Sequence, residues 1–360
     1  MSRPKTYDIA VLGGGAAGLA AALTAAKSAR TVLVLNRPFD PHAPLRIDAI
    51  PARTLALLVE FSITPSAIGA ERLHDRQQSC WATELPQWSR GPQTAHIERP
   101  ALEAALFDMV RANGRIDIVV DRVKPKYRRG FTGTCWSARH LIDATGRAAV
   151  TAQARVRPRP AWGSRFFWAP RTAVRATPEF RIAALPGGYA YRLGSADHIG
   201  IGLVGRGALL KSDAPALGRL LRQTDAQWLC EDMPPLESMV RGASGVTSVQ
   251  WAVPGRAVLI GDASIARDPL SSQGLAASLS DALYGVAVIL TGDIASLRAR
   301  QAENLRAHLM CLKAALMQCR YLDNAHWTAY ERFIVANITG RVDRPASALR
   351  HGRLETMPEY

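Results

Sequence analysis

The stretch Gly13-Gly14-Gly15-Ala16-Ala17-Gly18 constrains the fold of this 360-residue chain more than any other. It has the form G-x-G-x-x-G and lies between an apolar run, Tyr7–Leu12, and a helical pattern, Leu19–Lys27. Glycines at the first two motif positions permit a tight turn and a close approach of the backbone to a pyrophosphate, and the last lets the helix pack on the strand. A second apolar run, Thr31–Leu35, follows at the expected distance. The sequence therefore predicts a strand–turn–helix–strand unit that binds a dinucleotide.

Two later stretches also consist of an apolar run that stops at a glycine turn. The first is Leu141–Arg147, which reads LIDATGR, and the second is Ala257–Ala277, which reads AVLIGDASIARDPLSSQGLAA. In the second, a carboxylate at the end of a buried strand can bind a polyol, Pro269 gives a rigid wall, and the amides of Ser271–Gly274 open a helix, where negative charge is favoured. Taken alone, this stretch is equally compatible with a plain turn that has no chemical role.

In order and spacing, the three stretches together resemble the FAD-dependent aromatic monooxygenases of the p-hydroxybenzoate hydroxylase superfamily, which includes the flavin halogenases. The resemblance covers Tyr7–Leu290. Within that superfamily, D-P-L-S-S-Q-G is most similar to the flavoproteins that hydroxylate a tryptophan during maturation of quinone-cofactor enzymes, such as the monooxygenase of quinohemoprotein amine dehydrogenase biogenesis.

The resemblance implies an α/β, Rossmann-like FAD-binding fold of the p-hydroxybenzoate hydroxylase type, with an inserted antiparallel-sheet substrate domain and C-terminal helices. Residues 1–150 and 245–292 are expected to form the discontinuous FAD-binding domain, and residues 151–244 the substrate-side sheet. Residues 293–336 are expected to form a C-terminal helical region, read as one long helical pattern from Asp293 to about Val335, and residues 337–360 a loosely ordered tail.

The resemblance also implies roles for particular residues. Asp262 would bond the ribityl chain, Pro269 would lie on the side of the flavin that reacts with O₂, and the Ser271–Gly274 amides would stabilise the reduced ring. Arg46 and Asp48 lie where the superfamily has a mobile loop that contacts the flavin, so the resemblance makes them candidate residues at the flavin edge. A helix-capping turn with solvated charges is an equally weighted alternative. The predicted catalytic residues are Pro269, Arg46 and Asp48, and the predicted cofactor-binding residues are Gly13, Gly15, Ala16, Ala17, Gly18, Asn36, Arg37, Arg46, Arg99, Val120, Asp143, Gly146, Gly261, Asp262, Pro269, Ser271, Ser272, Gln273, Gly274 and Leu275.

For the dinucleotide, NADP is an alternative to FAD. The position that often carries an acid for the ribose 2′-OH is Asn36, followed by Arg37, and this pair would also suit the 2′-phosphate of NADP. The stretches at Asp143 and Asp262 favour FAD. Since Gly202–Gly207 has the wrong order for a second G-x-G-x-x-G, we expect NADH, NADPH or a reduced flavin to act as a transient electron donor, with O₂ as co-substrate.

The predicted reaction is monooxygenation of an electron-rich aromatic ring. Reduced flavin and O₂ supply the oxidant, so the absence of a Ser/His/Asp pattern does not argue against an enzyme. Halogenation is an alternative. The pattern of that family has a lysine near the substrate pocket and a W-x-W-x-I-P stretch, which Trp162-Gly163-Ser164 and Trp168-Ala169-Pro170 do not match. The sequence also leaves open a small-molecule aromatic hydroxylase, a saturating reductase and a non-catalytic flavin-binding maturation factor. Aromatic residues of the region, such as Trp162, Phe166, Phe167, Trp168, Tyr189 and Tyr191, either line an aromatic pocket or belong to the core.

Charge and cysteine content bear on partners and compartment. The chain has 45 Lys+Arg against 30 Asp+Glu, a formal net charge of +15. The basic residues are spread without an aromatic-interleaved patch, so we expect an acidic protein or peptide substrate bearing tryptophan and no nucleic acid, with plain arginine bias as the alternative. No membrane span is expected, because Asp281 interrupts Leu275–Leu290.

The five cysteines lack C-x-x-C spacing, which favours reduced thiols in the cytoplasm. The histidines are scattered along the chain, so no metal site is predicted.

Overall fold

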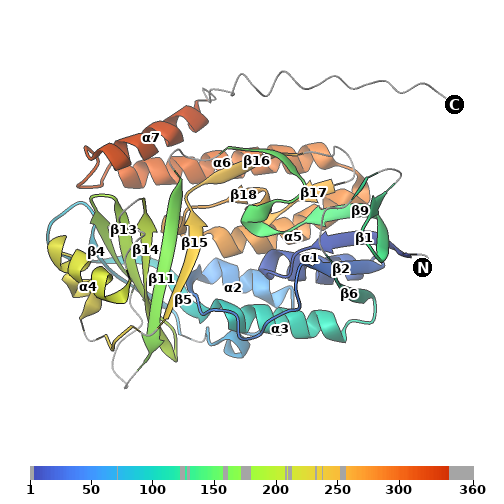
Figure 1. Ribbon diagram of the computed structural model, residues 1–360, viewed down its shortest axis with the longest axis horizontal. Helices are drawn as coiled ribbons and strands as arrows, with labels where there is room; N and C mark the ends of the chain where they lie inside the picture. The colour runs from blue at the N-terminus through green and yellow to red at the C-terminus, as the bar shows by residue number, and fades with distance from the viewer. Residues whose placement is uncertain are drawn as a thin grey trace.

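The computed structural model describes residues 4–70, 72–121, 126–127, 130–156, 161–171, 180–206, 209, 213–231, 233–236, 238–251 and 257–339. Within these residues the chain forms two large sheets and one small sheet, with helices packed over them (Figure 1). The small sheet consists of β10 (Ala152–Val156), β16 (Thr247–Trp251) and β18 (Ile265–Ala266).

The first large sheet is mostly parallel and contains the predicted dinucleotide unit. Its parallel strands run in the order β6-β2-β1-β9-β17, and the short β8 and β7 extend it antiparallel beyond β9. Every residue of β2 is buried, as expected for a strand covered on both faces. The strands are β1 (Lys5–Leu12), β2 (Thr31–Leu35), β6 (Ile116–Val120), β7 (Lys126–Tyr127), β8 (Phe131–Thr132), β9 (Trp136–Asp143) and β17 (Ala257–Leu259).

Helices α1 (Ala16–Ala26), α2 (Ala52–Val59), α3 (Arg99–Ala112) and α5 (Gly274–Thr291) pack beside this sheet. The alanine-rich α1 has small side chains and therefore packs closely against both α3 and α5. By length and composition α5 is apolar enough to cross a membrane, but nine of its residues are buried and it packs against α1, α2 and α6 (Ile294–Leu316). In this structure α5 is a helix of the protein core.

The second large sheet has eight strands in the order β15-β11-β14-β13-β12-β4-β5-β3. Helix α4 (Ala214–Gln223) packs on its outer face through Leu217 and Leu221. Strands β3 to β5 come from before residue 100, so this sheet draws on both sides of residue 150 and is larger than the sequence alone indicates. The strands are β3 (Ile47–Pro51), β4 (His74–Cys80), β5 (Gln87–Glu98), β11 (Trp162–Pro170), β12 (Phe180–Leu185), β13 (Gly188–Gly194), β14 (His198–Gly205) and β15 (Ser238–Ser244).

In the C-terminal region, the long helical pattern from Asp293 to about Val335 is divided between two helices. Helix α6 ends at Leu316, and α7 (Ala325–Ile338) begins after Asn324, whose side chain accepts a hydrogen bond from the His326 amide at 3.0 Å. No glycine or proline marks the break. It lets α7 turn back onto the eight-stranded sheet, where Trp327 Nε1 donates to the Leu185 carbonyl at 2.8 Å. Of the expected tail, residues 340–360 lie outside the described part of the chain.

Candidate active site

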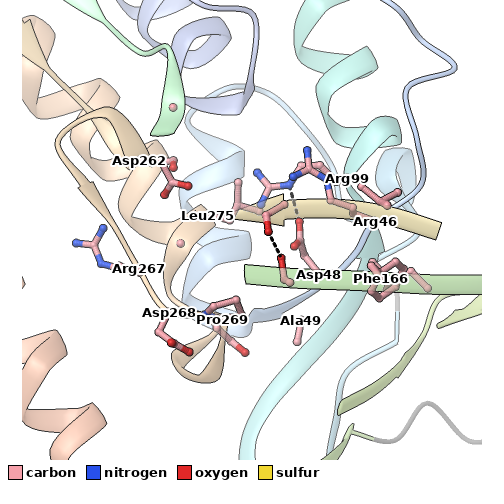
Figure 2. Close-up of a pocket in the computed structure, with 18 of the residues that line it drawn as sticks. Arg46, Asp48, Ala49, Arg99, Phe166, Asp262, Arg267, Asp268, Pro269 and Leu275 are labelled. Carbon is pink, nitrogen blue, oxygen red and sulfur yellow. Dashed lines mark hydrogen bonds and ion pairs between the residues drawn. The ribbon is translucent and has the colours of Figure 1, made fainter. Parts of the chain in front are cut away.

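A cavity of about 500 Å³ opens between the end of the parallel sheet and one face of the eight-stranded sheet. Figure 2 shows Asp262, Arg267, Asp268 and Pro269 approaching it from one side, and Arg46, Arg99 and Phe166 from the other. The cavity brings together many of the predicted residues, namely Gly15, Ala16, Ala17, Arg46, Asp48, Arg99, Gly146, Asp262, Pro269, Ser272, Gly274 and Leu275.

The three motif glycines at the start of α1 have different roles. A Cβ on Gly18 would lie 1.9 Å from the Gly13 carbonyl oxygen, so this position holds the helix against the turn. Gly13 has a φ of +107°, which favours glycine. Among the described residues, a Cβ at Gly15 would meet only Glu103 Oε1, at 3.7 Å. The space beside Gly15 is therefore open on the cavity side, as binding of a pyrophosphate there requires.

Glu103, which the sequence motifs do not reveal, lies at the same helix terminus. It projects from α3 into the cavity, and its Oε1 accepts a hydrogen bond from the Ala16 amide at 3.4 Å. This carboxylate therefore lies beside the position at which the helix would receive a phosphate.

We expect Glu103→Gln to bind FAD more tightly than the wild type, by roughly threefold to tenfold, because one like charge near the phosphates is removed. Quenching of FAD fluorescence on titration with protein measures the affinity. Glu303→Gln, the same change at an exposed position of α6, is the matched control and should leave the affinity unchanged. Weaker binding of FAD by Glu103→Gln would show that this side chain contacts the cofactor favourably.

Arg46, Asp48 and Arg99 line the cavity and are connected to one another by hydrogen bonds, so they do not form a solvated capping turn. Arg99 Nε donates to Asp48 Oδ2 at 2.5 Å, and the Arg99 amide donates to the Arg46 carbonyl at 2.8 Å. Burial alone would lower the pKa of Arg99, but the nearby carboxylates of Asp48 and Glu103 outweigh it and the pKa is raised. Asp48 thus serves as the ion-pair partner that holds Arg99 in place.

Arg147 joins the two glycine turns, a role that the motif LIDATGR does not disclose. Its guanidinium donates to the Gly245 carbonyl at 2.9 Å and to the Arg267 carbonyl at 3.1 Å. Its Nε also lies 3.9 Å from Asp262 Oδ2. These contacts fix the segment that carries Asp262, whose side chain stays 42% exposed and available to a ligand.

The turn at Pro269 is held by the residue before it. Asp268 is 1% exposed, and its carboxylate accepts hydrogen bonds from the Tyr189 hydroxyl at 2.6 Å and the Tyr330 hydroxyl at 2.7 Å. Burial, and next the charge of Asp268, raises the pKa of both tyrosines well above 10, so both remain donors. The Asp268 amide donates to Nε2 of His308, whose pKa burial and Arg267 lower to about 3. Helices α6 and α7 thereby anchor the turn.

The N-terminus of α5 presents backbone donors to the cavity. The Ala277 amide donates to the Gln273 carbonyl at 3.0 Å, so the amides of Gly274 and Leu275 precede the first turn of helical hydrogen bonds. Both residues line the cavity, and Ser272 reaches it in a left-handed conformation with a φ of +49°. This arrangement suits an electron-rich ring edge.

Aromatic side chains cover the opposite wall. Phe166, Phe180, Tyr189 and Tyr191 line the cavity from three strands of the eight-stranded sheet, whereas Trp162 and Phe167 belong to the core. Glycines on β14 make room for two of these rings. A Cβ on Gly200 would lie 2.3 Å from the Phe166 ring, and one on Gly202 would lie 2.0 Å from the Tyr191 ring. The wall is thus shaped for a flat apolar ligand.

Several predicted cofactor residues do not face the cavity. Asp143 is fully buried, and its oxygens accept hydrogen bonds from Thr145 and Thr151 at 2.6–2.9 Å, so the predicted contact with the cofactor is corrected to a role in holding the turn. The amide of Gly261 is likewise occupied, because it donates to Asp281 Oδ2 at 3.1 Å. Ser271 donates to the Asp268 carbonyl through both its amide and its hydroxyl. Gly13, Gly18 and Gln273 also lie outside the cavity. So do Asn36, Arg37 and Val120, which are exposed at or just beyond the ends of their strands. The contacts of these three residues with the cofactor stay predictions.

Comparisons with known proteins agree with this architecture. Residues 8–40 match the family model described as FAD binding domain. The structure is similar to the myxobacterial chondrochloren halogenase CndH, with a TM-score of 0.74 and 17% identity over 96% of this chain and 93% of that one. It is also similar to 2,6-dihydroxypyridine-3-hydroxylase from Arthrobacter nicotinovorans, with a TM-score of 0.66 and 17% identity over 88% and 94%. The fold is that of the flavin-dependent halogenases and hydroxylases.

This flavoprotein fold confirms the predicted α/β class, and the match at residues 8–40 supports FAD as the dinucleotide. A further similar structure is described as the peptidyl tryptophan dihydroxylase QhpG, essential for tryptophylquinone cofactor biogenesis. Its TM-score is 0.61, and its 22% identity extends over 100% of this chain and 81% of that one. No curated protein sequence matches this chain.

Proposed function

We propose that this protein is an FAD-dependent monooxygenase that hydroxylates an electron-rich aromatic ring, namely a tryptophan side chain carried on a protein or peptide. The observation that carries the proposal is the composition of the cavity. Pro269 and the amides of Gly274 and Leu275 lie on its cofactor side, and the rings of Phe166 and Tyr191 lie on its sheet side. An aromatic substrate between them would pack on rings and face the cofactor.

The residues present fit FAD. The open space at Gly15 suits the pyrophosphate, Asp262 suits a polyol, and the α5 terminus suits the flavin ring edge. Bound reduced flavin, together with O₂, supplies the oxidant for oxygen transfer. The protein's own part is to hold the Pro269 turn rigid through Asp268, to orient the substrate ring against the aromatic wall, and to exclude water from the space between.

Two observations support a polypeptide rather than a small molecule as substrate. The similarity to the peptidyl tryptophan dihydroxylase extends over 100% of this chain. The net charge of +15 favours an acidic partner. NADH, NADPH or a reduced flavin would supply electrons transiently, and the reaction would take place in the cytoplasm.

Halogenation is the second candidate, because the chondrochloren halogenase is so similar in fold. The lining of the cavity argues against it, since none of the described residues that line it is a lysine, the residue that the halogenase pattern requires near the substrate.

The two reactions are distinguished by their products. FAD-loaded protein, reduced chemically without air, is mixed with O₂, bromide and a tryptophan-containing acidic peptide, and the peptide is analysed by mass spectrometry. We expect the peptide to gain oxygen and no bromine, at a rate that does not depend on bromide. A brominated product would favour the halogenase, and conversion of free indole but not of the peptide would favour a small-molecule hydroxylase.

A further inference from the structure

We propose that the polypeptide substrate binds as an added strand along the free edge of β15, with its tryptophan directed into the cavity and acidic residues directly before and after it beside Arg241. This inference rests on the proposed function and adds how the substrate is held.

Strand β15 is an edge strand at the cavity. Within the described residues it pairs only with β11, so one side of its backbone is left for another strand (Figure 1). Residues 240–243 line the cavity, and Arg241, Gly242 and Ala243 are exposed. An exposed edge offers a row of backbone donors and acceptors, which is the feature that binds extended peptides by strand addition.

The side chains on the two faces of β15 have different surroundings, as binding of such a substrate requires. Val240 packs against Phe166 on the cavity face. Met239 packs with Phe167 on the other face, where its sulfur accepts a hydrogen bond from Arg165 at 3.3 Å. Because side chains alternate along a strand, Arg241 leaves β15 on the same side as Met239, although Arg241 and its partner Arg165 also line the cavity. An added strand would follow the same alternation, so a residue pointing into the cavity would have neighbours that point towards Arg241.

Charge on the outer face favours acidic neighbours. Arg165 and Arg241 lie directly opposite each other in the β11–β15 ladder, where like charges are unfavourable. Burial, and next the charge of Arg241, lowers the pKa of Arg165. In the described part of the chain Arg241 makes no ion pair. A carboxylate from an added strand would pair with the exposed Arg241.

The test uses pentapeptides and FAD-loaded protein, with affinity measured by calorimetry and oxygen gain measured separately. Ac-Ser-Glu-Trp-Glu-Ser-NH2 places its acids next to tryptophan, and Ac-Glu-Ser-Trp-Ser-Glu-NH2 has the same composition with the acids one residue further away. We expect the first to bind tighter by roughly threefold to tenfold. Arg241→Glu should abolish this preference, whereas Arg219→Glu, the same charge change at an exposed position of α4, should keep it.

Backbone methylation tests the strand pairing itself. Alternate residues of an added strand direct their N–H groups to β15. One peptide is methylated on the backbone nitrogen of tryptophan, and the other on the backbone nitrogens of both glutamates. One of the two should therefore lose roughly tenfold in affinity, and the other should stay within about threefold of the unmethylated peptide. Equal affinities in both peptide series would overturn the docking mode. If the peptides gain oxygen without this pattern, the proposed function stands without the docking mode; if they bind with the pattern but gain no oxygen, the docking mode stands and the proposed function fails.

Discussion

Gly15→Val is expected to fold like the wild type and to lose FAD affinity by roughly a hundredfold, or about 2.7 kcal/mol. The backbone at Gly15 is extended, with a φ of −83°, so valine is tolerated there. An added Cβ meets only Glu103 Oε1, at 3.7 Å, among the described atoms within 4 Å, which leaves the FAD-free protein unstrained. In the complex the valine side chain would fill the space that the pyrophosphate needs.

Comparison with Gly18→Val separates binding from folding. A Cβ at Gly18 would lie 1.9 Å from the Gly13 oxygen, so this variant should lose its native structure. Circular dichroism and thermal unfolding report on the fold, and fluorescence titration reports on FAD. Full FAD affinity in a folded Gly15→Val protein would show that the pyrophosphate does not bind at α1.

Asp268→Ala should lower the free energy of unfolding of the FAD-free protein by about 3 kcal/mol, because two buried tyrosine hydroxyls lose their acceptor. Tyr189 is 1% exposed and Tyr330 is 3% exposed, so water does not easily replace the carboxylate. Chemical denaturation measures the change. Tyr330→Phe, which removes one of the two donors and leaves Asp268 in place, should cost about 1 kcal/mol.

Asp262→Ala, six residues earlier in the same segment, is the matched control for this effect. The Asp262 side chain is 42% exposed, so its removal should change stability by about 0.5 kcal/mol or less. Equal costs for Asp268→Ala and Asp262→Ala would mean that the tyrosine contacts do not anchor the Pro269 turn.

Local signals in the sequence were sufficient to predict the parallel half of the fold. The glycines at 13, 15 and 18 combine a tight turn with close helix packing, and the apolar runs on either side of them have strand and helix lengths. The turns at Gly146 and Pro269 were also predicted, because glycine and proline restrict the backbone wherever they occur.

Features that depend on contacts between distant segments could not be predicted in this way. In the described part of the chain, the polar β4–β5 hairpin joins the second sheet through pairing with β12 and β3, which lie elsewhere in the chain. Glu103 reaches Ala16 across 87 residues, and Tyr330 reaches Asp268 across 62. Such side chains carry no motif of their own. Asp143 was assigned to the cofactor because the resemblance places its stretch on FAD, but the neighbouring threonines occupy its oxygens.

The flavin content of the purified protein tests the central claim most directly. The structure and the match at residues 8–40 predict one FAD per chain, bound noncovalently and released intact on acid precipitation. Absorbance of the protein before and after precipitation, with chromatography of the released flavin, gives both the stoichiometry and the identity. A folded protein that is colourless and takes up no FAD on titration would contradict the assignment.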